Sequence, residues 1–538
     1  MGWQLRPPPG EAGSAAPAIM IGCFVAFGGI LFGYDTGTIG GIIAMKYWLK
    51  LFSTGYELDG KPAITASQSS EIVSLLSAGT FFGALGAAFL GDAIGRRLGL
   101  IVSCCIFCFG VILQVAATAI PLFVTGRFFA GFGVGLVSAL VPLYQSETAP
   151  KWIRGSIVGS YQFCITIGLF LAAIVDNGTK NRNDTGSYRI PVAIQFAWAI
   201  ILITGMLLLP ETPRYKIKSN EPEAAARSLS RLRKLPFDHP ALVEELAEVQ
   251  ANHDYEMRLG KATYVDCFKG TLGKRLMTGC FLQGLQQLTG VNFIFYYGTS
   301  YFTQTGIQNP FIVSVITDVV NVTSTIPGLY AVEKWGRRPM LFWGAVGMCV
   351  CQFIVAITGT ADGSSVVANK VLIAFVCIYI FFFASTWGPI AWVVTGEIFP
   401  LKARAKCLSM TTATNWLLNW AIAYATPYLV NPGAGNANLG SKVFFIWGSF
   451  CLICAFFVYS LIYETKGLSL EQVDELYGKC DKAWQSTKFV PSVKFQEVRD
   501  METTDRSMSL ADLEGMAMRK KSVAQVEHPG MGNGENMV

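Results

Sequence analysis

Charged residues are scarce in this sequence. Of its 538 residues only 14% are Asp, Glu, Lys or Arg, whereas 52% are hydrophobic. A soluble globular chain carries about a quarter charged residues, so a soluble enzyme is excluded. Histidine occurs only three times, and the sequence lacks a P-loop and the HEXXH and GXSXG motifs. We therefore expect no ATP-driven transport, no enzymatic activity and no cofactor or metal site.

A basic domain and a cleavable leader are also missing. The net charge is +6, but Lys and Arg occur in short clusters between apolar runs, which argues against nucleic acid as a partner. The first apolar run begins at about Ala18 and ends in polar residues and Asp35 rather than in a small-residue cleavage site. It is interpreted as a membrane helix, not as a signal peptide.

Long apolar runs make up most of the chain. A membrane-spanning helix needs about 20 apolar residues. The sequence contains twelve runs of about this length, which we expect to lie in the lipid bilayer. They lie near residues 18–43, 71–91, 98–118, 121–143, 155–175, 190–209, 274–302, 310–331, 340–359, 371–396, 406–430 and 441–462. We predict an all-α membrane protein with an N-terminal segment (1–17), two six-helix halves (18–209 and 274–462), a helical linker (210–273) and a largely disordered tail (463–538).

The distribution of Lys and Arg predicts the orientation in the membrane. Basic residues are most frequent in alternate short loops and in the linker, and such loops stay in the cytoplasm. Both termini and the linker are therefore expected to be cytoplasmic. Two N-x-T sequons, at Asn177 and Asn183, lie in the loop between the fifth and sixth helices. They are glycosylation candidates on the opposite, exterior side.

Short motifs recur in the two halves in the same order. An acidic residue is followed by Gly-Arg-Arg after the second helix of each half, and by Pro and then Arg after the fourth. The repeated stretches are 92–97 and 333–338, 147–154 and 397–404, and 210–214 and 464–465. Duplicated halves around a central site are typical of alternating-access carriers.

The motifs also give the sequence a resemblance to a known family. They are GDAIGRR (91–97), GRFFAGFG (126–133), PETPR (210–214), QQLTGVN (286–292), EKWGRR (333–338), EIFPLKAR (397–404) and YETKG (463–467). The sequence resembles the sugar porter family of the major facilitator superfamily over about residues 18–467, most of all fungal monosaccharide transporters. It departs from the family at Tyr463, where Pro is usual. The resemblance implies a multi-pass plasma-membrane carrier of glucose-like monosaccharides that functions as a monomer.

Carboxylates and arginines at the cytoplasmic helix ends are candidates for an inner gate. Arg pairs bidentately with carboxylates, and pairs that join the halves would hold the inner face shut. The candidates are Asp92 with Arg96, Glu147 with Arg154, Glu211 with Arg214, Glu333 with Arg337, and Glu397 with Arg404. The alternative is that these charges only set the topology.

Polar residues inside the apolar helices are candidates for binding sugar. Such residues are costly in a membrane unless they serve a pathway, and hexose binding needs amides, hydroxyls and an aromatic face. By resemblance, the positions that match hexose-binding residues are Gln162, Gln286, Gln287, Asn292, Asn321, Trp387, Trp392 and Asn415. For any single one, interhelical hydrogen bonding is the alternative.

Asp35 and Arg127 are the candidates for proton coupling. Both are predicted at similar depth in the membrane, where each charge would be expensive alone. Burial favours a protonated carboxyl and a nearby Arg favours the charged one, so a change in their separation would load and release a proton. By resemblance, this pair is found in proton-coupled members, although some facilitators keep the Asp. Asp318 is a further intramembrane carboxylate without an assigned role.

The sequence leaves three functions open. A proton symporter for glucose-like monosaccharides is favoured, a proton-independent facilitator is the main alternative, and a transporter-like glucose sensor is a third. The polar, Ser- and Thr-rich tail is expected to be disordered and to be open to regulatory proteins.

Overall fold

The computed structural model describes residues 13–58, 60–150, 154–258, 263–304, 309–361, 366–400, 403–433, 435–468, 470–480 and 482–489. Residues 1–487 form one unit, and the second unit, 488–538, has only its first two residues in the described part. The N-terminal segment 1–12 and the tail from 490 lie outside the described residues.

All twelve segments expected to cross the membrane contain helices. In the first half these are α1 (Ala16–Val25), α2 (Gly28–Ile42), α4 (Ala66–Ile94), α5 (Arg96–Ala116), α6 (Ile120–Thr148), α7 (Arg154–Thr179) and α8 (Gly186–Leu208). In the second half they are α12 (Gly270–Leu288), α13 (Val291–Gln304), α14 (Pro310–Trp335), α15 (Arg337–Ala361), α16 (Val366–Phe382), the π-helical turn Phe383–Trp387, α17 (Gly388–Glu397), α18 (Arg404–Val430) and α19 (Val443–Leu461). Within the described residues, ten helical spans are long and apolar enough to cross a bilayer. The all-helical fold is thus confirmed.

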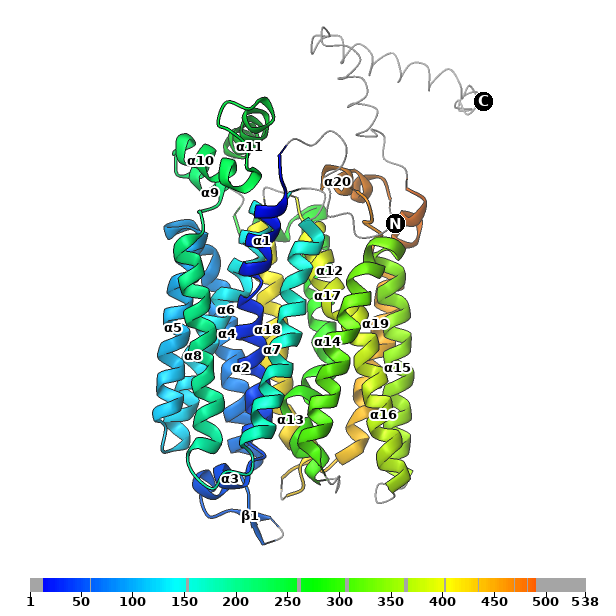
Figure 1. Ribbon diagram of the computed structural model, residues 1–538. Coiled ribbons are helices and arrows are strands. Elements are labelled where there is room, and N and C mark those ends of the chain that lie inside the picture. Colours follow the sequence, from blue (N-terminus) through cyan, green and yellow to red (C-terminus); the bar gives the residue numbers. More distant parts are fainter. Residues whose placement is uncertain are drawn as a thin grey trace, which may run out of the picture. The chain divides into compact units, whose positions relative to one another are not determined.

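The remaining elements lie at the two ends of the helix bundle (Figure 1). One end carries α9 (Pro213–Lys218), α10 (Pro222–Arg233), α11 (Pro240–Arg258), a turn at Asp266–Phe268, α20 (Leu470–Lys479) and a turn at Ala483–Lys488. The other carries α3 (Lys46–Phe52), the antiparallel pair β1 (Glu57–Leu58) and β2 (Lys61–Pro62), and a turn at Gly440–Lys442. We call them the α10 end and the α3 end.

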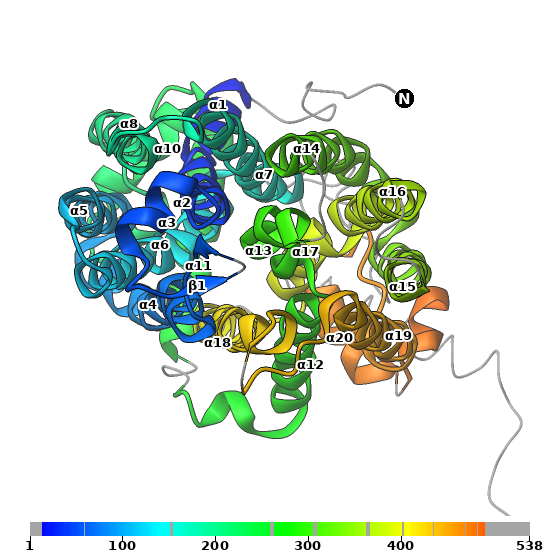
Figure 2. The same ribbon diagram turned by 90° about the horizontal axis from the view of Figure 1, so that it is seen from below.

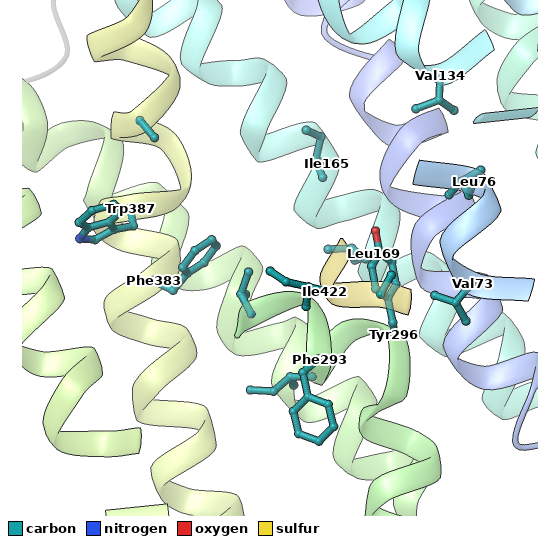
Figure 3. Packing of buried hydrophobic residues seen from close by; sticks show 14 of the residues in the cluster. Val73, Leu76, Val134, Ile165, Leu169, Phe293, Tyr296, Phe383, Trp387 and Ile422 are labelled. Carbon is teal, nitrogen blue, oxygen red and sulfur yellow. The ribbon is translucent and has the colours of Figure 1, made fainter. Parts of the chain in front are cut away.

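Seen along its axis, the bundle has α4, α5, α6 and α8 on one side and α14, α15, α16 and α19 on the other (Figure 2). Helices α13 and α17 lie near the middle. Apolar side chains of both halves, among them Leu76 and Val134 of the first and Trp387 and Ile422 of the second, belong to one continuous core (Figure 3). The core therefore surrounds the place where the halves meet.

Glycines allow the helices to approach closely. A Cβ atom at Gly33 would lie 2.0 Å from the carbonyl oxygen of Ile165, and one at Gly83 would lie 2.2 Å from that of Phe132. Helices α2 and α7, and likewise α4 and α6, are therefore in backbone contact, as expected for small residues in membrane helices. Gly290 has a different role: its φ of +85° separates α12 from α13.

The segment that is expected to be a largely disordered tail (463–538) begins with a folded part. Helix α20 is formed, and Val473 and Leu476 on one face are buried. Arg275 of α12 pairs with Asp474 and lies 4.4 Å from the Tyr477 ring centroid. An amphipathic helix of ten residues is too short to stand out in the sequence, but its packing against the second half stabilises it.

Candidate functional site

Amide side chains of α12, α13 and α18 form a hydrogen-bonded network inside the bundle. Asn415 donates to Gln286 Oε1 at 2.9 Å and to Gln283 Oε1 at 2.8 Å. Gln287 Oε1 accepts from Asn419 at 3.1 Å and from Asn292. All of these side chains are buried. Buried amides are retained where they have partners or a ligand, so the network marks the strongest candidate site for a polar substrate.

The network connects the two halves of the chain. Asn419 Oδ1 accepts from Tyr296 at 3.1 Å and from Ser77 of α4 at 2.6 Å. Gln286 also donates to the carbonyl of Trp387 at 2.8 Å, just before α17. On the first half, Gln162 of α7 is half-buried and its amide nitrogen lies 3.8 Å from the Cβ position of Gly388. A group bound here would contact both halves.

The tryptophans near the network are oriented differently. The Trp387 ring is fully buried, and its N–H donates to the carbonyl of Leu341 at 2.9 Å, so it packs within the second half instead of facing the amides. Trp392 is half-buried. Trp416, beside Asn415 in α18, packs edge-on to Phe32 of α2 with 5.1 Å between ring centroids. Its buried N–H has no partner among the described residues.

The structure brings together four of the predicted sugar contacts: Gln286, Gln287, Asn292 and Asn415. Asn321 is buried in α14 outside this network. The network also includes Gln283, which the sequence reasoning missed, one turn before Gln286 on the same helix. That spacing of three residues was a usable signal, because side chains at i and i+3 share a helix face.

Asp35 and Arg127 form an ion pair between α2 and α6. Arg127 Nη1 lies 3.0 Å from Asp35 Oδ1, and the two side chains are 0% and 1% exposed. The pair is only partly satisfied: Asp35 Oδ2 and Arg127 Nε and Nη2 have no partner among the described residues. Such a pair is sensitive to small movements, because partners are needed to offset desolvation of both charges.

At the α10 end, five residues of the first half and of the start of the linker form a polar cluster. Arg96 pairs with Glu147 at 3.0 Å and with Asp92 at 3.5 Å. Thr212 donates to Glu147 at 2.5 Å, and Glu211 accepts from the backbone N–H of Arg96 at 3.2 Å. Burial raises the pKa of Glu211, and hydrogen bonds from the backbone N–H groups of Thr212 and Arg97 partly offset this rise. The cluster ties α5 and α6 to the start of the linker.

The second half repeats this cluster with its own residues. Arg337 pairs with Glu397 at 2.9 Å, Thr465 donates to Glu397 at 2.6 Å, and Glu464 accepts from the backbone N–H of Arg337 at 3.0 Å. Each carboxylate lies against a glycine with positive φ. A Cβ at Gly95 would be 2.4 Å from Glu211 Oε2, and one at Gly336 would be 2.6 Å from Glu464 Oε2.

These ion pairs join helices of the same half. They connect the helices of each half at its α10 end. That they also hold the two halves together in one state of the transport cycle is a proposal. Arg404 donates to the carbonyl of Phe399 at 3.4 Å, and Arg214 is half-buried in α9. The side chains of Arg154 and Glu333 lie outside the described residues.

The two sequons differ in their setting. Asn177 lies within α7, and its side-chain oxygen accepts from Lys180 at 2.7 Å. Asn183 is exposed in the turn between α7 and α8. A glycan acceptor must be reachable on a surface loop, so the geometry favours Asn183.

Comparison with known proteins identifies the family. The family model described as "Sugar (and other) transporter" matches residues 21–477. The chain belongs to this sugar transporter family. The match confirms the resemblance read from the motifs and establishes a multi-pass membrane transporter of sugars, not an enzyme.

Three relatives and one solved structure place the chain within the sugar transporter family. It is 64% identical to the major facilitator-type transporter ecdD of Aspergillus rugulosus, over 91% of this chain and 93% of that protein. It is 56% identical to the probable glucose transporter rco-3 of Neurospora crassa, over 94% and 86%. The high glucose sensor RGT2 of Saccharomyces cerevisiae is 44% identical, over 89% and 63%. The proton:xylose symporter XylE, bound to 6-bromo-6-deoxy-D-glucose, superposes with a TM-score of 0.74 at 26% identity, over 86% of this chain and 100% of that chain.

Proposed function

We propose that this sugar transporter carries glucose-like monosaccharides across a fungal plasma membrane by alternating access, together with a proton. The observation that carries the proposal is the amide network of α12, α13 and α18, which lies where the two halves meet. In this arrangement the α10 end is cytoplasmic, as the Lys and Arg distribution predicts, and the α3 end is exterior.

The chemistry of the network suits a polyhydroxylated ring. Each amide has both donors and an acceptor, so Gln286, Gln287 and Asn415 can exchange their mutual hydrogen bonds for bonds to sugar hydroxyls. The unpaired N–H of Trp416 offers one more donor, and the half-buried Trp392 offers an aromatic face. The name of rco-3 as a probable glucose transporter supports a hexose substrate.

Proton coupling is supported by the partly satisfied Asp35–Arg127 pair. Tyr296 of α13 lies against α2, the helix of Asp35, since a Cβ at Gly40 would be 3.1 Å from its carbonyl oxygen. Its hydroxyl donates to Asn419, which contacts Gln287. A change in the ion pair can therefore affect the amide network through two side chains, those of Tyr296 and Asn419. The solved relative XylE is named a proton:xylose symporter, which favours symport over facilitation.

A glucose sensor is the second candidate, because RGT2 shares 44% identity with this chain. Uptake by the purified protein in liposomes separates the two. A transporter is expected to move labelled glucose into protein-containing vesicles faster than into empty ones, and unlabelled sugars of the same binding class should compete. If the protein binds glucose but vesicles take up none, the sensor is correct.

Gln287→Ala tests the proposed sugar contact. Loss of one hydrogen bond to a neutral partner costs about 1 kcal/mol, so the KM for glucose uptake is expected to rise about fivefold at unchanged surface expression. Gln114→Ala is the matched control, since Gln114 is also buried, in α5, but lies outside the network. If both variants keep the wild-type KM, Gln287 has a packing role only.

The orientation is tested by the glycan. With the α3 end outside, the protein from a eukaryotic membrane is expected to carry one N-linked glycan at Asn183. Asn183→Gln should abolish the mobility shift that glycosidase treatment causes, whereas Asn177→Gln should leave it unchanged. A shift that survives Asn183→Gln would contradict this assignment.

A further inference from the structure

Two carboxyl groups that the proposed transport mechanism does not use meet near the α3 end. Asp176 of α7 and Asp318 of α14 line the same small cavity, of about 20 Å³, and they are 2% and 6% exposed. One oxygen of each, Oδ1, has no hydrogen-bond partner among the described residues. A cavity of about 10–15 Å³ already holds a water-sized group, so this one has room for one small occupant.

The cavity lies between the two halves. Gly41 of α2 and Asp176 come from the first half, and Thr299 of α13 and Asp318 come from the second. Asp176 lies directly against α2, because a Cβ at Gly41 would be 2.2 Å from its Oδ2. Movement of α2 and α7 away from α13 and α14 would therefore open the cavity to solvent.

The groups around the cavity do not neutralise two negative charges. Thr299 and Ser314 hydrogen-bond each other at 2.7 Å, and Thr317 donates to the carbonyl of Ser314 at 2.8 Å. Lys180, directly after α7, donates to Asn177 and lies 5.0 Å from the centroid of the Phe311 ring.

Among the described residues, Tyr34 of α2 is a further titratable group near the cavity, and as a phenol it adds no positive charge. Within the described part of the chain, neither carboxylate forms an ion pair. Two charged carboxylates in one dry site repel each other and lose their hydration.

We propose that Asp176 and Asp318 form a proton-binding site that is occupied when the exterior side is closed and must release its proton for that side to open. The inference rests on the proposed movement of the two halves. The proton is taken from and returned to the exterior. It therefore controls the fraction of protein that is open to the exterior but does not drive sugar accumulation. Acidic medium favours the closed, protonated form, and opening becomes easier as the external pH rises.

A cysteine at Ser300 reports on this opening without any sugar. Ser300 lines a cavity of about 180 Å³ at the α3 end, together with Tyr56, Tyr301 and Asn431. In full-length protein, the labelling rate of Ser300→Cys by a membrane-impermeant maleimide is measured between pH 5.5 and 7.5. This rate is divided by the labelling rate of Lys50→Cys, a cysteine at an exposed position on α3. The division corrects for the change of thiol ionisation with pH.

Release of one proton on opening changes the open fraction by up to tenfold per pH unit. We expect the labelling ratio to rise severalfold per pH unit in Ser300→Cys. When Asp176→Asn and Asp318→Asn are added, the ratio should stay constant within twofold. When Glu71→Gln is added instead, the ratio should keep its slope, because the Glu71 carboxylate is exposed near the same end but lies outside the cavity. The slope should also persist in Asp35→Asn, which separates this site from proton coupling.

Three results would overturn the proposal. A flat ratio in Ser300→Cys with both aspartates present would do so even if the double variant failed to fold. A slope retained in the folded double variant would exclude these carboxyls. A ratio that changes at constant pH when Na⁺ is replaced by N-methylglucamine would make a metal cation, not a proton, the occupant.

Discussion

Vesicles that contain the wild-type protein are expected to accumulate glucose when their exterior is acidic, whereas Asp35→Asn vesicles should only equilibrate it. The amide mimics the protonated carboxyl, so the carrier can bind sugar and exchange it but cannot use a pH gradient. One pH unit supplies about 1.4 kcal/mol per proton, a tenfold concentration ratio. A membrane potential of about 100 mV adds about 2.3 kcal/mol.

The measurement is the ratio of internal to external labelled glucose at steady state, with and without a protonophore. Wild-type accumulation should collapse to unity with the protonophore, and the variant should stay at unity in both conditions. Equilibrium exchange of labelled glucose is the control that the variant still transports. If energised wild-type vesicles also reach only unity, Asp35 and Arg127 form a structural ion pair and the protein is a facilitator.

Removal of Arg96 or Arg337 is expected to destabilise the α10 end of one half. Arg96→Ala removes the ion-pair partner of Glu147, whose side chain is only 7% exposed, and Arg337→Ala removes one partner of Glu397, which is 25% exposed. Breaking a buried pair in this way costs about 3–5 kcal/mol, so we expect a lower melting temperature and a bias toward the inward-open form. Sugar binding should persist, because the amide network is on other segments.

Ser409→Cys provides the readout for the inward bias. Ser409 of α18 is buried and donates to the carbonyl of Ala84 in α4 at 3.2 Å, so a cysteine there becomes accessible when the halves separate at this end. Labelling from the cytoplasmic side is expected to increase in both Arg variants. Arg182→Ala, which removes an exposed ion pair, should change neither stability nor labelling. Reduced labelling would contradict a gating role.

The helices and part of the site could be predicted because they depend on local pattern. Gln286, Gln287 and Asn292 stand out as polar residues in an apolar helix. The orientation of Trp387 could not be predicted, since the π-helical turn Phe383–Trp387 contains one extra residue per turn and rotates the side chains that follow. Nor could the sequence predict that Asp176 and Asp318 share a cavity, because the contact depends on the packing of α7 against α14.

The repeated clusters at the α10 end differ in when they can form during synthesis. Glu211 and Thr212 follow α8 directly, so the first cluster is complete once the first half has left the ribosome. The second needs Glu464 and Thr465, which follow the last membrane helix and precede α20. Since segments fold in the order of synthesis, the second half stays unbraced until almost the whole chain is made. The first half can therefore be braced at this end while the second half is still being synthesised.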